Sequence, residues 1–364
     1  MSDDATLLHA IPRHYLDFVV RDPDADVLVV TNMWPDENRP VYGIFVERQV
    51  TSLRERGVRC DVIYIRGYRS PLAYVLAATQ FLVATVAWRH RYRLVHAHAG
   101  ETALVARLFV GPPMLVSYCG DDVLGNPGHD GSITLSSRLR AAVIRRHAGT
   151  CASTITKSRE MHERLSARIR RRNTVLPNGV DAALFAPQDK AEARDRLGWD
   201  ARERIVLFAA TKPDIPRKRR WLAEAACSTA SAEIGPIRLH VSGRTPPDEM
   251  PTLMSAADCL LHTASLEGSP NVVKEALMCN LPVIATPSGD LADLLDGVQP
   301  SFLCAPDAGV LAESLIEFFA KPARSNGRER IEAALSATAI ASRLLEIYSH
   351  FERNGHGSLT RAEG

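Results

Sequence analysis

Two glutamates, Glu267 and Glu275, frame the segment EGSPNVVKE, with seven residues between them. Ser269 fits the N-cap position of a helix and Pro270 its first position. The pattern predicts a helix to about Cys279, with Asn280 in the left-handed C-terminal position usually given to glycine, followed by a short buried strand. Because the first turn of a helix has free N–H groups and a partial positive charge, this helix start could bind a phosphate.

The residues around this helix start indicate which phosphorylated ligand would fit. Gly268 lets a ligand approach the backbone closely. Asn271 and Glu275 are four residues apart and share one helix face, where a carboxylate could accept hydrogen bonds from ribose hydroxyls. Glu267 could do the same for a sugar ring. The segment therefore predicts a site for a sugar joined to a phosphorylated nucleoside. The alternative is two surface acids that cap a helix.

The same residues support a family resemblance. EGSPNVVKE resembles the donor-site motif of the retaining glycosyltransferases of family 4, and the flanking ADCLLHTASLEGSPNVVKEALMCNLPVIATPSGD resembles that family along its length. The resemblance covers roughly residues 26 to 350. It implies the GT-B fold, with two facing Rossmann-like domains, an interdomain cleft and a nucleoside-diphosphate sugar as co-substrate.

Lys218, in PDIPRKRRWLAEA, precedes a helix of the second half. A lysine there could neutralise a diphosphate leaving group. The family pattern implies an Arg and a Lys on this loop; Lys218 fits the Lys, but no Arg matches, and Thr211 or Lys212 stands near its place. The alternative is a solvated basic loop. We take Lys218 and Glu267 as the candidate catalytic residues.

Candidate residues of the first half follow its predicted strands. Gly43 ends the loop after the first strand, and in the family this loop lies near the donor phosphate; an ordinary turn glycine is the alternative. His96 and His98 share one strand face. We expect His96 to be a core histidine and His98, at the strand end, to line the cleft. A metal site needs further ligands, and we expect none.

Another candidate contact follows the next predicted strand, in YCGDD. Many family members have His-Gly-x-Asp here, the His touching the donor sugar; this chain has Cys119 in that place and Asp122 at the Asp. We include both as candidate sugar or acceptor contacts. Cys119 has no evident basic partner that would make it a nucleophile.

The elements that would position these residues alternate between strand and helix, with strands predicted at 27–31 and 94–98 and helices over 158–169 and 331–352. This alternation predicts an α/β fold with parallel sheets. Ligands of such sheets bind at the carboxyl ends of the strands. Five parts are predicted along the chain. They are a lead-in (1–25), an N-terminal Rossmann-like acceptor domain (26–177), a C-terminal Rossmann-like donor domain (178–335), a helix crossing back to the first domain (336–353) and a tail (354–364).

Composition places the chain among globular proteins, with 46% hydrophobic and 24% charged residues among 364. Its net charge of +2 does not indicate a nucleic-acid partner. Seven scattered cysteines without a CxxC pair predict reduced core residues in a cytoplasmic protein. The start lacks a signal-peptide pattern. The apolar segment 71–88 is short for a membrane span, so we predict a buried or interfacial helix.

The segment 138–172 holds eleven Arg or Lys and two acids. Solvated helix faces are one explanation. The other is a basic surface that contacts an anionic membrane peripherally on its inner face, or a diphosphate-linked acceptor.

These observations predict a metal-independent, retaining hexosyltransferase of polysaccharide biosynthesis, using a UDP- or GDP-linked sugar and a glycan, lipid-linked or small-molecule acceptor. Two alternatives stay open. One is a sugar-nucleotide epimerase or phosphorylase on the same fold. The other is a catalytically silent sugar-nucleotide-binding subunit, motivated by Cys119 and the missing Arg.

Overall fold

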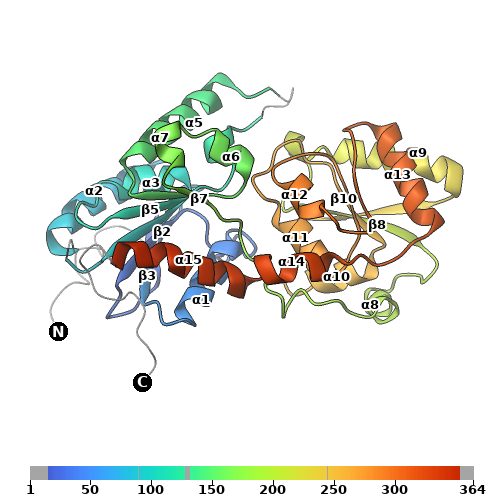
Figure 1. Cartoon of the computed structure of the whole chain (residues 1–364), viewed down its shortest axis with the longest axis horizontal. Coiled ribbons are helices and arrows are strands. Elements are labelled where there is room, and N and C mark those ends of the chain that lie inside the picture. The colour runs from blue at the N-terminus through green and yellow to red at the C-terminus, as the bar shows by residue number, and fades with distance from the viewer. Residues whose placement is uncertain (1–14, 89, 128–131, 244, 353–364) are drawn as a thin grey trace. The chain divides into compact units, whose positions relative to one another are not determined.

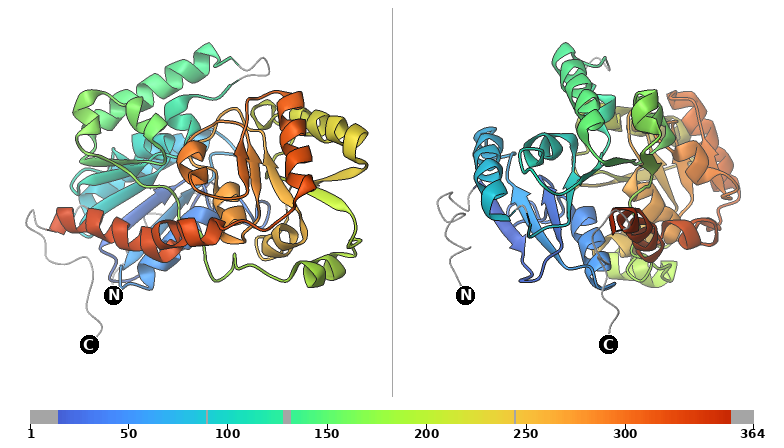
Figure 2. Two further views of the ribbon diagram at one scale, coloured as in Figure 1. Left: turned by 45° about the vertical axis from the view of Figure 1, so that its right-hand side comes forward. Right: turned by 60° about the vertical axis from the view of Figure 1, so that its left-hand side comes forward.

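The computed structural model describes residues 15–88, 90–127, 132–243 and 245–352, and its chain divides into two units. Unit 1 contains residues up to 125, residues 138–176 and residues from 340 onward. Unit 2 contains residues 126–137 and 177–339. Each unit is built on its own mainly parallel sheet with helices on both sides (Figures 1 and 2), as the α/β prediction requires.

The sheet of unit 1 has the order β1-β3-β2-β4-β5-β6-β7. Its strands are β1 (Leu16–Val20), β2 (Val27–Thr31), β3 (Cys60–Ile65), β4 (Leu94–His98), β5 (Met114–Ser117), β6 (Ser153–Thr156) and β7 (Asn173–Val175). All pairs are parallel except β1 with β3. The carboxyl ends of β2 and β4 to β7 therefore meet at one edge of the sheet.

Helices cover both faces of this sheet (Figure 1). They are α1 (Ile44–Arg54), α2 (Leu72–Trp88), α3 (Gly100–Ala106), α4 (Asp121–Leu124), α5 (Leu135–His147), η1 (Ala148–Thr150), α6 (Arg159–Glu163), α7 (Ala167–Arg170) and α15 (Ala337–Glu352). Right-handed crossovers place α2, α3 and α5 on one face and α1 on the other. α15 lies on the face of His96, since Tyr348 bonds to that side chain.

The sheet of unit 2 is fully parallel, in the order β12-β11-β10-β8-β9. Its strands are β8 (Arg204–Ala209), β9 (Ile237–Ser242), β10 (Cys259–His262), β11 (Val283–Ala285) and β12 (Ser301–Leu303). Its helices are α8 (Lys190–Leu197), η2 (Pro216–Lys218), α9 (Arg220–Ile234), α10 (Met250–Ala256), α11 (Asn271–Met278), α12 (Leu291–Leu295), α13 (Ala308–Ala320) and α14 (Gly327–Leu335).

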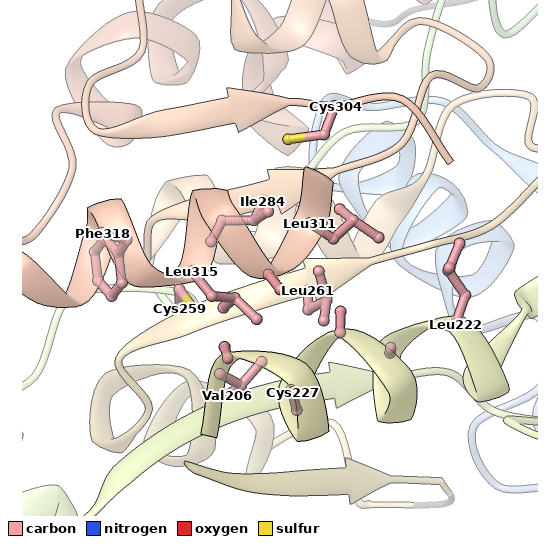
Figure 3. Close-up of a cluster of buried hydrophobic side chains, with 14 of the residues drawn as sticks. Val206, Leu222, Cys227, Cys259, Leu261, Ile284, Cys304, Leu311, Leu315 and Phe318 are labelled. Atoms are coloured by element: carbon pink, nitrogen blue, oxygen red, sulfur yellow. The ribbon is translucent and has the colours of Figure 1, made fainter. Parts of the chain in front are cut away.

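A buried cluster fixes α9 and α13 against this sheet (Figure 3). Strand residues Val206, Leu261 and Ile284 pack against Leu222 of α9 and Leu315 of α13, and all five are at most 2% exposed. Each such side chain contributes roughly 1.5–3 kcal/mol by burial. This core holds the carboxyl ends of β8, β10 and β11 in fixed places, where the candidate site lies.

Three predicted segments differ from the structure. The lead-in contains β1, an edge strand that pairs antiparallel with β3. The helix expected over 158–169 is two short helices, α6 and α7, because Ser166 is extended between them. The helix expected over 331–352 is interrupted at Ser336, which is extended and bridges to Val180. The predicted tail lies outside the described residues.

The apolar segment 71–88 forms α2, and within the described ranges no helix is long and apolar enough to cross a membrane. Ala73, Ala77 and Phe81 of α2 are buried, while Val86 is 83% exposed. All seven cysteines are free; six are buried, as predicted, and Cys119 is only half-buried.

Candidate functional site

The helix predicted at the centre of the site is α11, and it begins one residue later than expected. Pro270 is its N-cap and Asn271 its first residue, while Ser269 makes no side-chain cap. At the other end Asn280 has φ 55°, which confirms the predicted left-handed position. Its side chain also accepts a hydrogen bond from the Arg328 backbone N–H at 2.9 Å. The orientation of α11 is thus fixed at its C-terminus.

The turn before α11 is held by a second glycine that sequence reasoning did not single out. Gly289 has φ 58°, and a Cβ there would lie 2.6 Å from the Gly268 carbonyl oxygen and 2.9 Å from that of Glu267. Only glycine meets both the conformation and the space. The loop after β11 therefore supports the backbone of the Glu267–Gly268 turn from behind.

The predicted catalytic pair comes together in unit 2. Lys218 Nζ pairs with Glu267 Oε1, and Arg217 Nη1 lies 3.2 Å from the same oxygen. Burial by itself would raise the pKa of the Glu267 carboxyl, but the nearby positive charges of Lys218 and Arg217 lower it. Two cations thus share one ionised carboxylate, which leaves an excess of positive charge.

The loop that carries Lys218 is anchored to the ends of two strands. Thr263, after β10, donates its hydroxyl to the Lys218 carbonyl at 2.9 Å. Arg219 has φ 49° and donates to the Thr263 carbonyl at 2.7 Å and to Thr286 Oγ1 at 2.9 Å. These bonds keep Lys218 at the carboxyl edge of the sheet. The expectation of a solvated loop holds only for Arg220, whose ion pairs with Asp214 and Glu224 are exposed.

Arg217 is a site residue that sequence reasoning missed. The family pattern implies an Arg near positions 211 and 212. Both of these residues are exposed in the structure. Arg217 instead reaches Glu267 and donates to the Leu266 carbonyl at 3.2 Å. Arg217 directly precedes Lys218 in the sequence. Because it belongs to a run of four basic residues, the sequence does not distinguish it from its neighbours.

His262, the last residue of β10, lies near the same cluster. Its side chain is 4% exposed, and Nε2 has no hydrogen-bond partner among the described residues. Burial lowers its pKa to about 4, and Lys218 acts in the same direction. The imidazole is therefore neutral at pH 7.

The expected face of α11 is present. Asn271 and Glu275 are half-buried, as is Val272, whereas Val273 and Ala276 are buried in the core. Asn178 Nδ2 donates to Asn271 Oδ1 at 3.4 Å. The helix start, Lys218 and Arg217 together provide cationic groups and free N–H groups, and Glu275 provides an acceptor about one turn away.

Gly43 of unit 1 is required by its packing. It has φ 79° and caps α1, and a Cβ there would lie 2.2 Å from the Met33 carbonyl carbon. The structure therefore accounts for this glycine without any ligand. Its loop follows β2, at the carboxyl edge of the sheet.

The prediction for His96 is confirmed. Its Nδ1 lies 2.7 Å from Tyr348 Oη and its Nε2 lies 2.8 Å from Ser117 Oγ, so both nitrogens are satisfied in the core. Burial lowers its pKa to about 3. His98 is also buried, at 1% exposed, and its Nδ1 has no hydrogen-bond partner within the described part of the chain.

Asp122 organises the loop after β5. Its two carboxylate oxygens accept hydrogen bonds from the backbone N–H groups of Gly100, Cys119, Gly120 and Val123 at 3.0–3.2 Å. Burial raises its pKa to about 7. Cys119, the first residue of this loop, is half-buried, and burial raises the pKa of its thiol. The loop geometry thus depends on Asp122, and Cys119 is the residue that the loop presents.

No group of three His, Cys, Asp or Glu side chains that could hold a metal ion occurs in the described ranges. Unit 2 brings cations, helix N–H groups and carboxylate acceptors together at one sheet edge.

Comparisons with known proteins agree with this architecture. The family described as "Glycosyl transferase 4-like domain" matches residues 13–179, and that described as "Glycosyl transferases group 1" matches residues 225–334.

Individual relatives are distant. TuaC of Bacillus subtilis, named as a teichuronic acid biosynthesis glycosyltransferase, is 22% identical over 80% of this chain and 88% of its own. The D-inositol 3-phosphate glycosyltransferase of Thermobispora bispora is 30% identical over 54% of this chain, which spans about half (55%) of that relative. The structure of Anabaena HepE with UDP-glucose has a TM-score of 0.67 at 19% identity, covering 89% of this chain and 99% of that one.

Proposed function

This chain belongs to the group 1 and 4-like glycosyltransferases of GT-B fold, and we propose that it is a retaining enzyme whose unit 2 binds a nucleoside-diphosphate hexose. The observation that carries the proposal is the pairing of Lys218 and Arg217 with Glu267 beside the start of α11. A cluster with excess positive charge at a helix N-terminus suits a diphosphate. HepE, of similar fold, binds UDP-glucose, which supports a uridine-linked donor.

The proposed roles follow from the positions of the groups. Lys218 stabilises the negative charge that develops on the diphosphate as the sugar–phosphate bond breaks. Glu267 positions the Lys218 ammonium and accepts hydrogen bonds from the sugar hydroxyls. Glu275, on the half-buried face of α11, accepts hydrogen bonds from the ribose. The acceptor attacks from the face that the diphosphate leaves. Gly43, His98, Cys119 and Asp122 belong to unit 1, which we propose as the acceptor unit.

A thermal-shift panel of nucleotides and nucleotide sugars tests the donor class. A ligand at a hundred times its Kd adds about 2.7 kcal/mol of stability, which is readily measured. We expect stabilisation by one diphosphate series, uridine or guanosine. Stabilisation by none of them would overturn the donor site.

Two variants test the assignment within unit 2. Glu275→Ala should weaken binding of the stabilising nucleotide by about tenfold or more, since a charged acceptor is lost. Lys218→Met should weaken diphosphate binding and lower turnover. Arg220→Met is the control: it removes the same charge two residues further along the chain, where the ion pairs are exposed. Equal effects of Lys218→Met and Arg220→Met in calorimetric titrations would exclude a specific role for Lys218.

Turnover separates the proposal from its alternatives. Conversion of the donor sugar without an acceptor would indicate an epimerase, and turnover with inorganic phosphate would indicate a phosphorylase. Donor binding without turnover in any acceptor mixture would indicate a silent binding subunit.

We also propose that unit 1 contacts an anionic membrane through α2 and α5. α2 exposes an apolar stripe along one side: Leu72, Val75, Leu82, Val83 and Val86. α5 exposes Leu139 and Val143, with exposed Arg138 and Arg146 beside them. Both helices lie on the same face of the sheet, and an apolar stripe flanked by arginines suits an anionic lipid surface.

Not all arginines of the basic segment 138–172 are available for this contact. Arg140 pairs with Glu101 and Asp121, and Arg145 donates to the Val123 carbonyl at 2.7 Å. These arginines are engaged within the protein and add little to a membrane surface.

Flotation with vesicles tests the membrane contact. We expect binding to vesicles that contain phosphatidylglycerol and weaker binding to phosphatidylcholine alone. Val86→Glu should reduce the bound fraction several-fold, whereas Val310→Glu, at a less exposed helix position of unit 2 (37% against 83% for Val86), should not. Equal binding by both variants, or no binding to anionic vesicles, would refute the contact.

A further inference from the structure

A row of polar side chains crosses three neighbouring strand ends of unit 1. In the parallel register His98 lies opposite Ser117, and Ser117 lies opposite Ile155. Because side chains alternate along a strand, Cys119 and Lys157, each two residues further on, continue the same face. This is the face on which Tyr348 of α15 bonds to His96. His98, Cys119 and Lys157 therefore gather at the carboxyl edge, one step beyond that covered histidine.

Lys157 is the unusual member of this row. Its side chain is 2% exposed, and Nζ has no hydrogen-bond partner among the residues that the structure describes. An ammonium group deprived of both water and a partner is costly to bury. Burial lowers its pKa, while the neighbouring Cys119 and Asp122 oppose that shift.

Asp122, the carboxylate that acts electrostatically on Lys157, is already engaged. The Asp122 carboxylate is used by four backbone N–H groups of its own loop and of the start of α3. At the end of β4, His98 Nδ1 is also buried without a partner in the described ranges. Two unpartnered nitrogens, at the ends of β4 and β6 on one face with β5 between them, leave hydrogen-bonding capacity that no described protein group uses.

We propose that Lys157, with His98, forms an anion-binding subsite in unit 1 for a carboxylate or phosphate group carried by a substrate. Half-buried Cys119 lies between the two and marks the side from which a ligand would reach them. An anion would supply the negative charge that the Lys157 ammonium lacks as a partner. It would accept hydrogen bonds from Lys157 Nζ and from the His98 imidazole. The subsite selects a sugar acid or a phosphorylated substrate over a neutral one. That use rests on the proposed function.

The subsite explains why a lysine stands where an apolar residue would fit. Replacing a buried unpaired charge by an apolar side chain of similar length removes a desolvation cost. A residue that lowers stability is expected at a sheet edge where ligands bind, if the residue contributes to ligand binding. The hydroxyls of its sequence neighbours are engaged elsewhere, since Thr156 Oγ1 accepts from Asn173 Nδ2 at 2.9 Å and Ser158 Oγ accepts from the Met161 N–H at 3.3 Å.

The test uses the full chain saturated with UDP, so that the diphosphate site of unit 2 is occupied. D-Glucuronate, D-glucose 6-phosphate and neutral D-glucose are titrated by calorimetry against wild type, Lys157→Met and Arg159→Met. Arg159 is exposed at the start of α6, two residues from Lys157. Arg159→Met is therefore the control, because it removes the same charge outside the proposed subsite. We expect an anion to bind wild type and Arg159→Met alike, and Lys157→Met about tenfold or more weakly.

The two anion arms distinguish the source of the charge. Preference for glucuronate indicates a sugar acid, preference for glucose 6-phosphate a phosphorylated substrate, and equal binding a shared anion site. The proposal falls if neither anion binds wild type better than glucose, or if Lys157→Met binds the anion like wild type. Lys157→Gln replaces Lys157→Met if the latter does not fold, which loss of its cooperative thermal melt would reveal. GDP replaces UDP if wild type binds only GDP. Failure to bind either nucleotide overturns the donor site instead, and the anion titrations without nucleotide still decide this proposal.

Discussion

Glu267→Gln is the most informative single perturbation of the charged cluster, because its carboxylate is shared by two cations. The carboxylate pairs with Lys218 and lies 3.2 Å from Arg217, and the side-chain exposures are 14% for Glu267, 15% for Lys218 and 28% for Arg217. Removing one partner of a buried ion pair costs about 3–5 kcal/mol. Since these groups retain some solvent, we expect Glu267→Gln to lower the free energy of unfolding by about 2–3 kcal/mol.

A double-mutant cycle isolates the pair from other effects. Urea unfolding of Glu267→Gln, Lys218→Met and the double variant should give a coupling of about 1–3 kcal/mol, because the residues are in direct contact. The exposed pair Arg220–Glu224, four residues apart on α9, is the matched control. We expect it to couple by about 0.3–0.5 kcal/mol. Equal couplings for the two pairs would refute the reasoning.

The pH dependence provides an independent check. The pKa of Glu267 is lowered in the folded protein, so its stabilising contribution is complete above the ordinary glutamate pKa of about 4.3. It is lost as the pH falls through the lowered, folded value. The stability difference between wild type and Glu267→Gln should therefore be constant from about pH 7 to pH 5 and shrink below pH 4. A difference that persists at low pH would show that the ion pair is not its cause.

Three further variants test other contacts. Gly289→Ala should lower the free energy of unfolding by about 1–3 kcal/mol and weaken nucleotide binding, because the new Cβ meets the Gly268 carbonyl at 2.6 Å; thermal melts with and without nucleotide measure both. Lys157→Met should raise the free energy of urea unfolding by roughly 1 kcal/mol, since it removes a buried unpaired charge; a loss would mean that the ammonium is satisfied. Tyr348→Phe should cost about 1–3 kcal/mol, because His96 Nδ1 loses its partner at 2.7 Å; unchanged urea unfolding would contradict this.

Elements with strong local signals were predictable. The apolar run 27–31 and the segment 94–98, where histidines alternate with apolar residues, form strands with the predicted bounds, and every residue in them is buried. Asn280 takes the predicted left-handed position because its short polar side chain tolerates it. The edge strand β1 was missed because four of its five residues are only half-buried, and its pairing depends on β3, distant in the sequence.

Within the site, local patterns identified the elements but not all of their partners. The pairing of Lys218 with Glu267 joins residues 49 positions apart and depends on how β8 and β10 pair. Lys157 stands in a run of basic residues that predicts solvated helix faces, yet strand register buries it. Arg217 and Arg219 are neighbours of Lys218 with equal charge, and only the backbone of the loop decides which reaches Glu267.

The bond between Tyr348 and His96 joins residues 252 positions apart, and this has a consequence for synthesis on the ribosome. Unit 1 takes its last helix from residues beyond 340, whereas the main segment of unit 2, residues 177–339, is continuous. The nascent chain therefore holds the whole sequence of unit 2 before unit 1 can cover the His96 face of its sheet. Unit 1, although translated first, completes its core last, when α15 has been synthesised.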